Sequence, residues 1–110
     1  MTMESKGVQM LTKDAGARPG TVRVTFQFPA IVWAETVHLV GEFNAWDQRS
    51  LPLSRSRRDD PNWEITLELE QGRAYQFRYL VNGTAWCNDC NPDGYAPNQY
   101  GGSNSIVQTG

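Results

Sequence analysis

The amino-acid sequence predicts an all-β fold, an immunoglobulin-like sandwich of two antiparallel sheets. Three observations carry this prediction: apolar residues alternate with polar ones in several short stretches, turn residues separate these stretches, and no stretch keeps a helical period for three turns. The chain has 110 residues, enough for one domain with one hydrophobic core. Periodicity alone suits a small barrel equally well.

The first long strand is expected over residues 21–28, where apolar side chains at every second position share one face, and Pro29 ends it. Alternation resumes over residues 37–41 and briefly over residues 51–53. Both of these stretches predict short strands at best.

Two longer strands follow in close succession over residues 63–70 and 75–81. The dipeptide Asn82-Gly83 then predicts a tight hairpin, because both residue types tolerate a positive φ. Residues 87–103 are rich in Asn, Asp, Gly and Pro, which predicts a long ordered loop before a last short strand around residues 106–107. The core expected from these faces consists of Val24, Phe26, Leu39, Trp63, Ile65, Leu67, Phe77, Tyr79 and Val81.

Residues 1–20 are polar and without a sustained period, which predicts a flexible leader, ordered structure from near Thr21, and a domain over residues 21–110. The leader has charged residues and no apolar run, so it predicts neither a signal peptide nor a membrane span, and we expect the protein in the cytoplasm. The formal net charge is −2 with both signs mixed, so no nucleic-acid partner is expected.

The two cysteines, Cys87 and Cys90, have the spacing of half a zinc site or of a redox pair. Zinc takes four ligands, however, and His38 is the one histidine of the chain. We therefore expect two reduced thiols, with no metal and no cofactor.

Two tryptophans fall outside the core register of the strands. Trp46 lies in a polar stretch after residues 37–41, and Trp86 follows the Asn82-Gly83 turn in a second polar stretch. A loop tryptophan is often a cover over the edge of a core. The alternative is a platform for a ligand, because a sugar ring offers a face of C–H groups to a flat aromatic surface and a rim of hydroxyls to polar neighbours.

Several motifs together resemble carbohydrate-binding module family 48. They are VHLVGEFNAW at residues 37–46, WEITLEL at 63–69 with Gly72, YQFRYLVNG at 75–83, Trp86, Asp89, and GGSNS at 101–105. The family includes the early-set domains at the N-termini of isoamylases and glycogen branching enzymes, and the glycogen-binding domain of the AMP-activated kinase β subunit. The resemblance covers roughly residues 21–107 and implies a β-sandwich rather than a barrel.

The resemblance also implies a non-catalytic function, the binding of an α-glucan polysaccharide or oligosaccharide such as glycogen or starch. The residues in the sugar-contacting places of the family are Trp46, Arg78, Trp86, Tyr100 and Asn104. One departure concerns Trp86, because Thr84 and Ala85 stand where kinase-type members usually have a single residue, which could displace the ring.

Another hypothesis is a docking domain of the same fold that contacts a glycogen-metabolism enzyme or a kinase-type partner, since a surface of Trp33, Trp46 and Trp86 would suit a protein as well as a sugar. Catalysis is the least favoured hypothesis. A glycosidase needs two carboxylates across a cleft, and acidic residues in turns commonly serve local hydrogen bonding instead.

Overall fold

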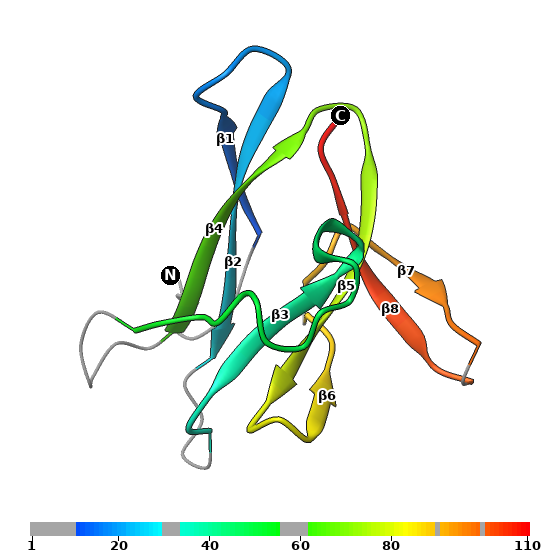
Figure 1. The fold of residues 1–110 in the computed structure, drawn as a ribbon. Coiled ribbons are helices and arrows are strands. Elements are labelled where there is room, and N and C mark those ends of the chain that lie inside the picture. Colours follow the sequence, from blue (N-terminus) through cyan, green and yellow to red (C-terminus); the bar gives the residue numbers. More distant parts are fainter. Residues whose placement is uncertain (1–10, 30–33, 56–61, 90, 100) are drawn as a thin grey trace, which may run out of the picture.

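The computed structural model describes residues 11–29, 34–55, 62–89, 91–99 and 101–110. These residues form two antiparallel sheets that pack against each other (Figure 1). The elements are β1 (Thr12–Ala15), β2 (Thr21–Pro29), β3 (Val37–Gly41), the 3-10 helix η1 (Glu42–Asn44), β4 (Asn62–Glu70), β5 (Ala74–Val81), β6 (Ala85–Cys87), β7 (Gly94–Pro97) and β8 (Ser103–Gln108). The all-β sandwich predicted from the sequence is confirmed.

The smaller sheet has three strands in the order β1-β2-β4, and β2 pairs with β4 along its whole length. The larger sheet has five strands, with the order β3-β5-β8-β7 and with β6 also paired to β5. Strand β5 is therefore the centre of this sheet: its first half pairs with β8 and its second half with β6, while β3 lies along its other edge.

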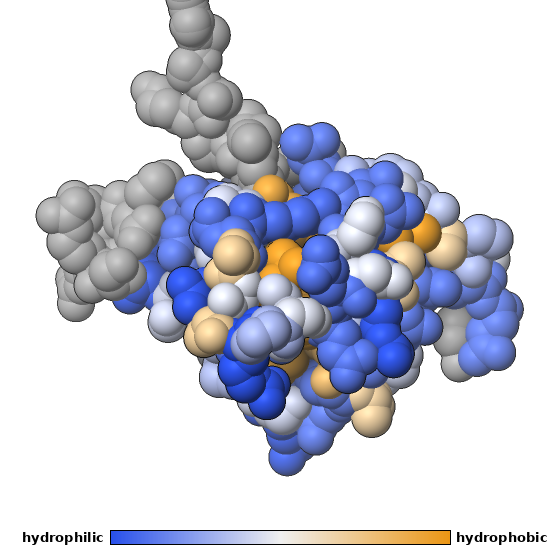
Figure 2. Space-filling view, turned by 90° about the horizontal axis from the view of Figure 1, so that it is seen from above, coloured by the Kyte–Doolittle hydropathy of each residue, from blue (hydrophilic) through white to orange (hydrophobic). Residues whose placement is uncertain are grey.

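The core lies between the sheets and combines aliphatic side chains with a cluster of aromatic rings. Phe26 of the smaller sheet meets Phe77 of the larger one edge to face, with ring centroids 5.1 Å apart, and Phe28 meets Tyr79 at 5.0 Å. Of the predicted core, the residues on β2, β3 and β5 are buried, and Trp63, Ile65 and Leu67 of β4 are partly buried against them. Seen from the end with the β4–β5 turn, hydrophobic residues show only in small areas between hydrophilic ones (Figure 2).

The Asn82-Gly83 turn joins β5 to β6 as predicted, with φ angles of 54° and 72°. Both angles lie in the left-handed region that this dipeptide tolerates.

Ordered structure does not begin at Thr21 as expected, because residues 12–15 form strand β1 and pair with residues 22–25 of β2. All four β1 side chains are exposed, so the strand has no apolar alternation to reveal it. Residues 1–10 lie outside the described residues. The expected loop over residues 87–103 likewise contains strand β7, and the last strand is longer than expected.

Leu80 and His38 show that the outward face of the larger sheet is partly covered. Both lie on the outward face of the larger sheet, yet Leu80 is buried and His38 is half-buried. They face each other across β3 and β5, and Trp86 flanks Leu80 from β6. Side chains on both neighbouring strands therefore cover Leu80, which strand alternation cannot predict.

Candidate functional site

Trp46 is presented by a tight loop after β3. The helix η1 occupies a single turn and ends at Asn44, and the next two residues, Ala45 and Trp46, have φ angles of 57° and 60°. The left-handed conformation is unfavourable for residues with a side chain, at a cost of about 1–3 kcal/mol for each, and it persists only where neighbouring contacts impose it. Strain of this kind is common at binding sites, which makes this loop a candidate site.

Asn44 supplies the contacts that impose this conformation. Its Oδ1 accepts a hydrogen bond from the Gly41 N–H at 3.0 Å. Its Nδ2 donates to the carbonyl oxygens of Leu39 at 3.4 Å and Asp47 at 3.0 Å, and to Ser50 Oγ at 2.9 Å. This one side chain therefore bonds to both ends of the loop, so the Trp46 side chain is attached to a backbone of fixed conformation.

Gly41 holds the start of the same loop through its backbone groups. Its N–H donates to Asn44 Oδ1. Its carbonyl oxygen accepts a hydrogen bond from the Trp46 N–H at 2.9 Å. A Cβ atom at this position would lie 2.7 Å from the carbonyl oxygen of Gln76 and 2.8 Å from Phe77 Cβ. Strand β5 therefore approaches β3 so closely at the base of the loop that only glycine fits without displacement.

Trp86 stands on β6, opposite Leu80 of β5. Its ring is 40% exposed, and the Arg78 Cζ atom lies 5.9 Å from the ring centroid. Such a cation–π contact contributes roughly 0.5–1 kcal/mol at an exposed site and holds the two side chains against each other. No carboxylate of the described residues forms an ion pair with Arg78, so its guanidinium keeps donors for a ligand.

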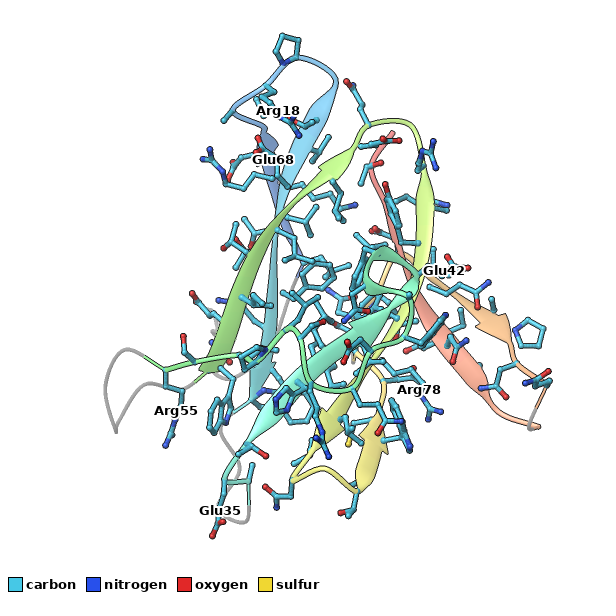
Figure 3. All side chains as sticks on the ribbon, in the orientation of Figure 1. Arg18, Glu35, Glu42, Arg55, Glu68 and Arg78 are labelled. Carbon is cyan, nitrogen blue, oxygen red and sulfur yellow. The ribbon has the colours of Figure 1, made fainter. Side chains whose placement is uncertain are left out.

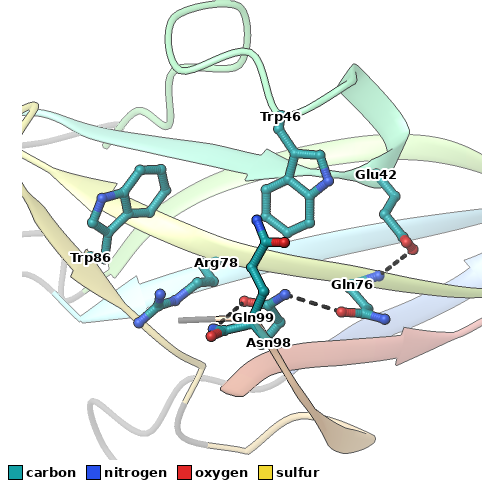
Figure 4. A pocket seen from close by; sticks show the side chains of 8 residues that line it. Glu42, Trp46, Gln76, Arg78, Trp86, Asn98 and Gln99 are labelled. Atoms are coloured by element: carbon teal, nitrogen blue, oxygen red, sulfur yellow. Dashed lines mark hydrogen bonds between the residues drawn. The ribbon is translucent and has the colours of Figure 1, made fainter. Parts of the chain in front are cut away.

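These side chains line one groove with a volume of about 760 Å³ on the outward face of the larger sheet (Figure 4). Arg78 and Glu42 point from this sheet away from β2 and β4 (Figure 3). Four of the five residues named by the family resemblance meet here, and Tyr100 lies outside the described residues. The lining consists of Glu42, Trp46, Gln76, Arg78, Trp86, Asn98, Gln99 and Asn104.

The two tryptophan rings are both exposed in this groove, at 38% for Trp46 and 40% for Trp86. The extra residue before Trp86 therefore does not remove it from the site. Figure 4 shows Arg78 below Trp86, and Glu42 and Gln76 at the Trp46 end. Gln76, Glu42, Asn98 and Gln99 were not expected from the sequence, because a single polar residue on a strand face or in a turn carries no signal of its own.

The base of the β6–β7 loop is fixed by a buried carboxylate. Asp89 accepts hydrogen bonds from the Tyr79 hydroxyl at 2.8 Å and from the Asn91 N–H at 2.9 Å, and its own N–H donates to Ser105 Oγ at 2.9 Å. Burial raises the pKa of Asp89 above its usual value, the two hydrogen bonds oppose this, and the nearby Asp93 charge adds to it. These contacts tie the loop to β5 and β8 behind the groove.

Cys87 is a free thiol, half-buried against the core, and burial raises its pKa despite the nearby charge of Arg78. Cys90 lies outside the described residues, as does Trp33. Within the part of the chain that the structure describes, no group of three or more His, Cys, Asp or Glu side chains is placed to hold a metal ion. No helix among those residues is long and apolar enough to span a membrane.

Comparison with known proteins shows which family the chain resembles. Residues 16–97 match the family described as carbohydrate-binding module 48 (isoamylase N-terminal domain). The chain is 35% identical over 104 residues to the 1,4-alpha-glucan branching enzyme GlgB of Photobacterium profundum. The matched region covers 92% of this chain and 14% of the enzyme. It is 31% identical over 80 residues to GlgB of Aquifex aeolicus, which covers 69% of this chain and 12% of the enzyme.

The chain thus spans about one seventh of the first of these enzymes and one eighth of the second. The matched family accounts for most of the described strands, from the β1–β2 turn to β7. On the strength of this match, the chain belongs to carbohydrate-binding module family 48.

Proposed function

We propose that this domain binds α-glucan of the glycogen or starch type and does not catalyse a reaction on it. The observation that carries the proposal is the groove in which two exposed tryptophan rings lie with Arg78 and several amide side chains. Trp46 and Trp86 serve as platforms for glucose faces. Arg78 and Asn104 bind hydroxyls at the rim, and Tyr100 completes the site by family resemblance.

The chemistry of the groove suits a neutral polyhydroxyl ligand. Each ring offers a flat apolar surface to the C–H face of a glucose unit. The guanidinium and amide groups offer donors and acceptors to its hydroxyls, which can act in both ways. The fork of Arg78 favours two adjacent oxygens, because its N–H groups are planar and fixed in direction.

The acidic residues favour binding over hydrolysis. Among the described residues that line the groove, Glu42 alone is acidic, and one of its oxygens accepts the Gln76 backbone N–H at 2.8 Å. Hydrolysis of a glycosidic bond normally uses two carboxylates on opposite sides of the bond. The two relatives act on 1,4-alpha-glucan according to their names, and we infer that a module of this kind holds the glucan for an enzyme in the cytoplasm.

The experiment compares Trp46→Ala and Trp86→Ala with the wild-type domain in calorimetric titrations with maltoheptaose. Each substitution removes one stacking platform, which costs about 1–3 kcal/mol if sugar stacking resembles base stacking, or roughly a ten- to hundredfold loss of affinity. The melting temperature should change little, since both rings are exposed. Trp63→Ala is the matched control: Trp63 packs against the core and beneath Arg55, so it should lose about 3 kcal/mol of stability and retain its affinity.

Salt provides an independent check. If the ligand is a neutral glucan, its affinity should be the same at low and high ionic strength. A charged protein partner held by Arg78 would bind more weakly in high salt. If the wild-type domain binds no α-glucan, the proposal fails and the docking hypothesis replaces it. If it binds and neither tryptophan variant is weaker, the function stands and the site is wrong.

A further inference from the structure

Three amide side chains form a hydrogen-bonded row along one wall of the groove. Asn98 Nδ2 donates to Asn104 Oδ1 at 3.3 Å, and Asn104 Nδ2 donates to Gln76 Oε1 at 3.0 Å. The three residues come from the β7–β8 turn, from β8 and from β5. Figure 4 shows Gln76 near Glu42 and Asn98 beside Gln99.

The direction of this row is fixed by the backbone. The oxygen and nitrogen of an amide side chain are distinguished by their hydrogen-bond partners. The Gly102 N–H donates to Asn98 Oδ1 at 3.1 Å, and the Asn98 N–H donates to the Gly102 carbonyl at 2.9 Å. Turning the Asn98 amide over would place two donors face to face. Its Nδ2 must therefore point to Asn104, and each following amide must take the same direction.

The row ends at a donor. Gln76 accepts through Oε1, so its Nε2 carries two N–H groups for which the described residues supply no acceptor. The Gln76 backbone is held from the other side by Glu42 Oε1, which accepts its N–H at 2.8 Å. The Gln76 side chain is half-buried and lies on the same face of β5 as Arg78, two residues away.

Asn104 lies in the middle of the row and also lines the groove. Its Oδ1 accepts from Asn98, and one N–H of its Nδ2 is used by Gln76. Half of its hydrogen-bonding capacity is therefore used within the protein, and one N–H and one lone pair remain for a ligand. Because Asn104 bonds to both neighbours, the orientation of the Asn98 amide sets the orientation of the Gln76 amide.

We propose that Gln76 is a sugar-contacting residue that fixes the hydrogen-bond polarity of the site. Its Nε2 donates to a glucose hydroxyl oxygen at the Trp46 end of the groove. Asn98 is a positioning residue that acts through Gln76, and Asn104, which also lines the groove, links the two. This inference rests on the proposed function. The amide that accepts at Oε1 is polarised by that bond, which strengthens donation from Nε2. Gln76 and Arg78 then present donors to successive oxygens of one glucan chain.

The test measures affinity for maltoheptaose and for a series of monodeoxy maltosides, with melting temperature as the check on folding. Gln76→Leu removes the donor and should weaken maltoheptaose about three- to tenfold. Gln76→Glu keeps the size and the acceptor but cannot donate, and it should lose as much. Gln27→Leu is the matched control, because Gln27 lies on β2 and bonds to Glu64, away from the groove; its affinity should not change.

Asn98→Asp tests the row itself. An aspartate still accepts from the Gly102 N–H but cannot donate to Asn104, so affinity should fall although the turn contact survives. Because the effect passes through Gln76, the double variant with Gln76→Leu should bind no more weakly than Gln76→Leu alone.

The deoxy sugars separate a contact from a structural role. Removal of one particular hydroxyl should weaken sugar binding by the wild-type domain. The same removal should leave the affinity of Gln76→Leu unchanged. If Gln76→Leu loses the same factor for every analogue, or binds maltoheptaose as well as wild type does, the inference is wrong although the proposed function stands. If the wild-type domain binds none of the sugars, the proposed function fails first.

Discussion

Replacing Asn44 by alanine should weaken both the fold and the binding site, because this one side chain holds the Trp46 loop in its left-handed conformation. The substitution removes four hydrogen bonds and changes no other residue of the loop. Ser50→Ala is the matched control, since it removes only one of the two exposed hydrogen-bond partners of the Asn44 amide.

The magnitude follows from the position of each bond. The bonds to Gly41 and Leu39 are part-buried and count about 1 kcal/mol each, whereas the two exposed bonds are replaced by water and count about 0.5 kcal/mol each. Release of the strained φ angles at Ala45 and Trp46 returns about 1 kcal/mol for each residue, or about 2 kcal/mol together. The net loss is about 1 kcal/mol, which lowers the melting temperature of a domain of this size by roughly 4–8 °C.

Thermal unfolding followed by near-ultraviolet circular dichroism measures the stability, and calorimetric titration with maltoheptaose measures the affinity. We expect Asn44→Ala to bind about tenfold more weakly below its melting temperature, because the Trp46 ring loses its fixed direction. Ser50→Ala should change stability by about 0.5 kcal/mol or less. The reasoning is refuted if Asn44→Ala melts with the wild type and binds as tightly.

Three further predictions concern the surroundings of the groove. Gly41→Ala should cost about 1–3 kcal/mol in chemical denaturation, since its Cβ would lie 2.7 Å from the carbonyl oxygen of Gln76; an unchanged midpoint would contradict the close approach of the strands. The raised pKa of Asp89 means that the folded state holds this proton more tightly, so stability falls as pH rises from the ordinary aspartate pKa of about 3.9 to the raised value. Melting temperatures from acid to neutral pH should show the Asp89→Asn variant without this fall, and an equal slope would exclude the assignment. Protein purified without chelator should contain no stoichiometric zinc, and the double serine variant of Cys87 and Cys90 should melt close to wild type; bound metal or loss of folding would reverse this view of the thiols.

The larger strands could be predicted because burial of one face leaves a period of two in the sequence. The sequence of strand β5 alternates clearly, and Asn82-Gly83 follows it directly, so both its face and its turn follow from local rules. Strand β1 has four exposed side chains, and β7 has the sequence GYAP, so neither carries that signal. Their pairing partners, β2 and β8, decide their structure.

The tryptophans of the site could be found because their positions break the core register of the strands, and the family resemblance then gave them a role. Gln76 could not be found in this way, since a glutamine on the outward face of a strand is ordinary. Its role as a donor depends on Asn98 and Asn104, which stand more than twenty residues later in the chain. Only the pairing of β5 with β8 brings them together.

An NMR titration of the nitrogen-15-labelled domain with maltoheptaose tests the central claim most directly. The indole N–H signals of Trp46 and Trp86 and the side-chain amide of Gln76 should shift with one common saturation curve. The indole signal of Trp63, whose Nε1 is buried on the other sheet, should stay in place. Saturable shifts confined to the Trp63 side, or no shift at any sugar concentration, would contradict a glucan site on the outward face of β3, β5 and β6.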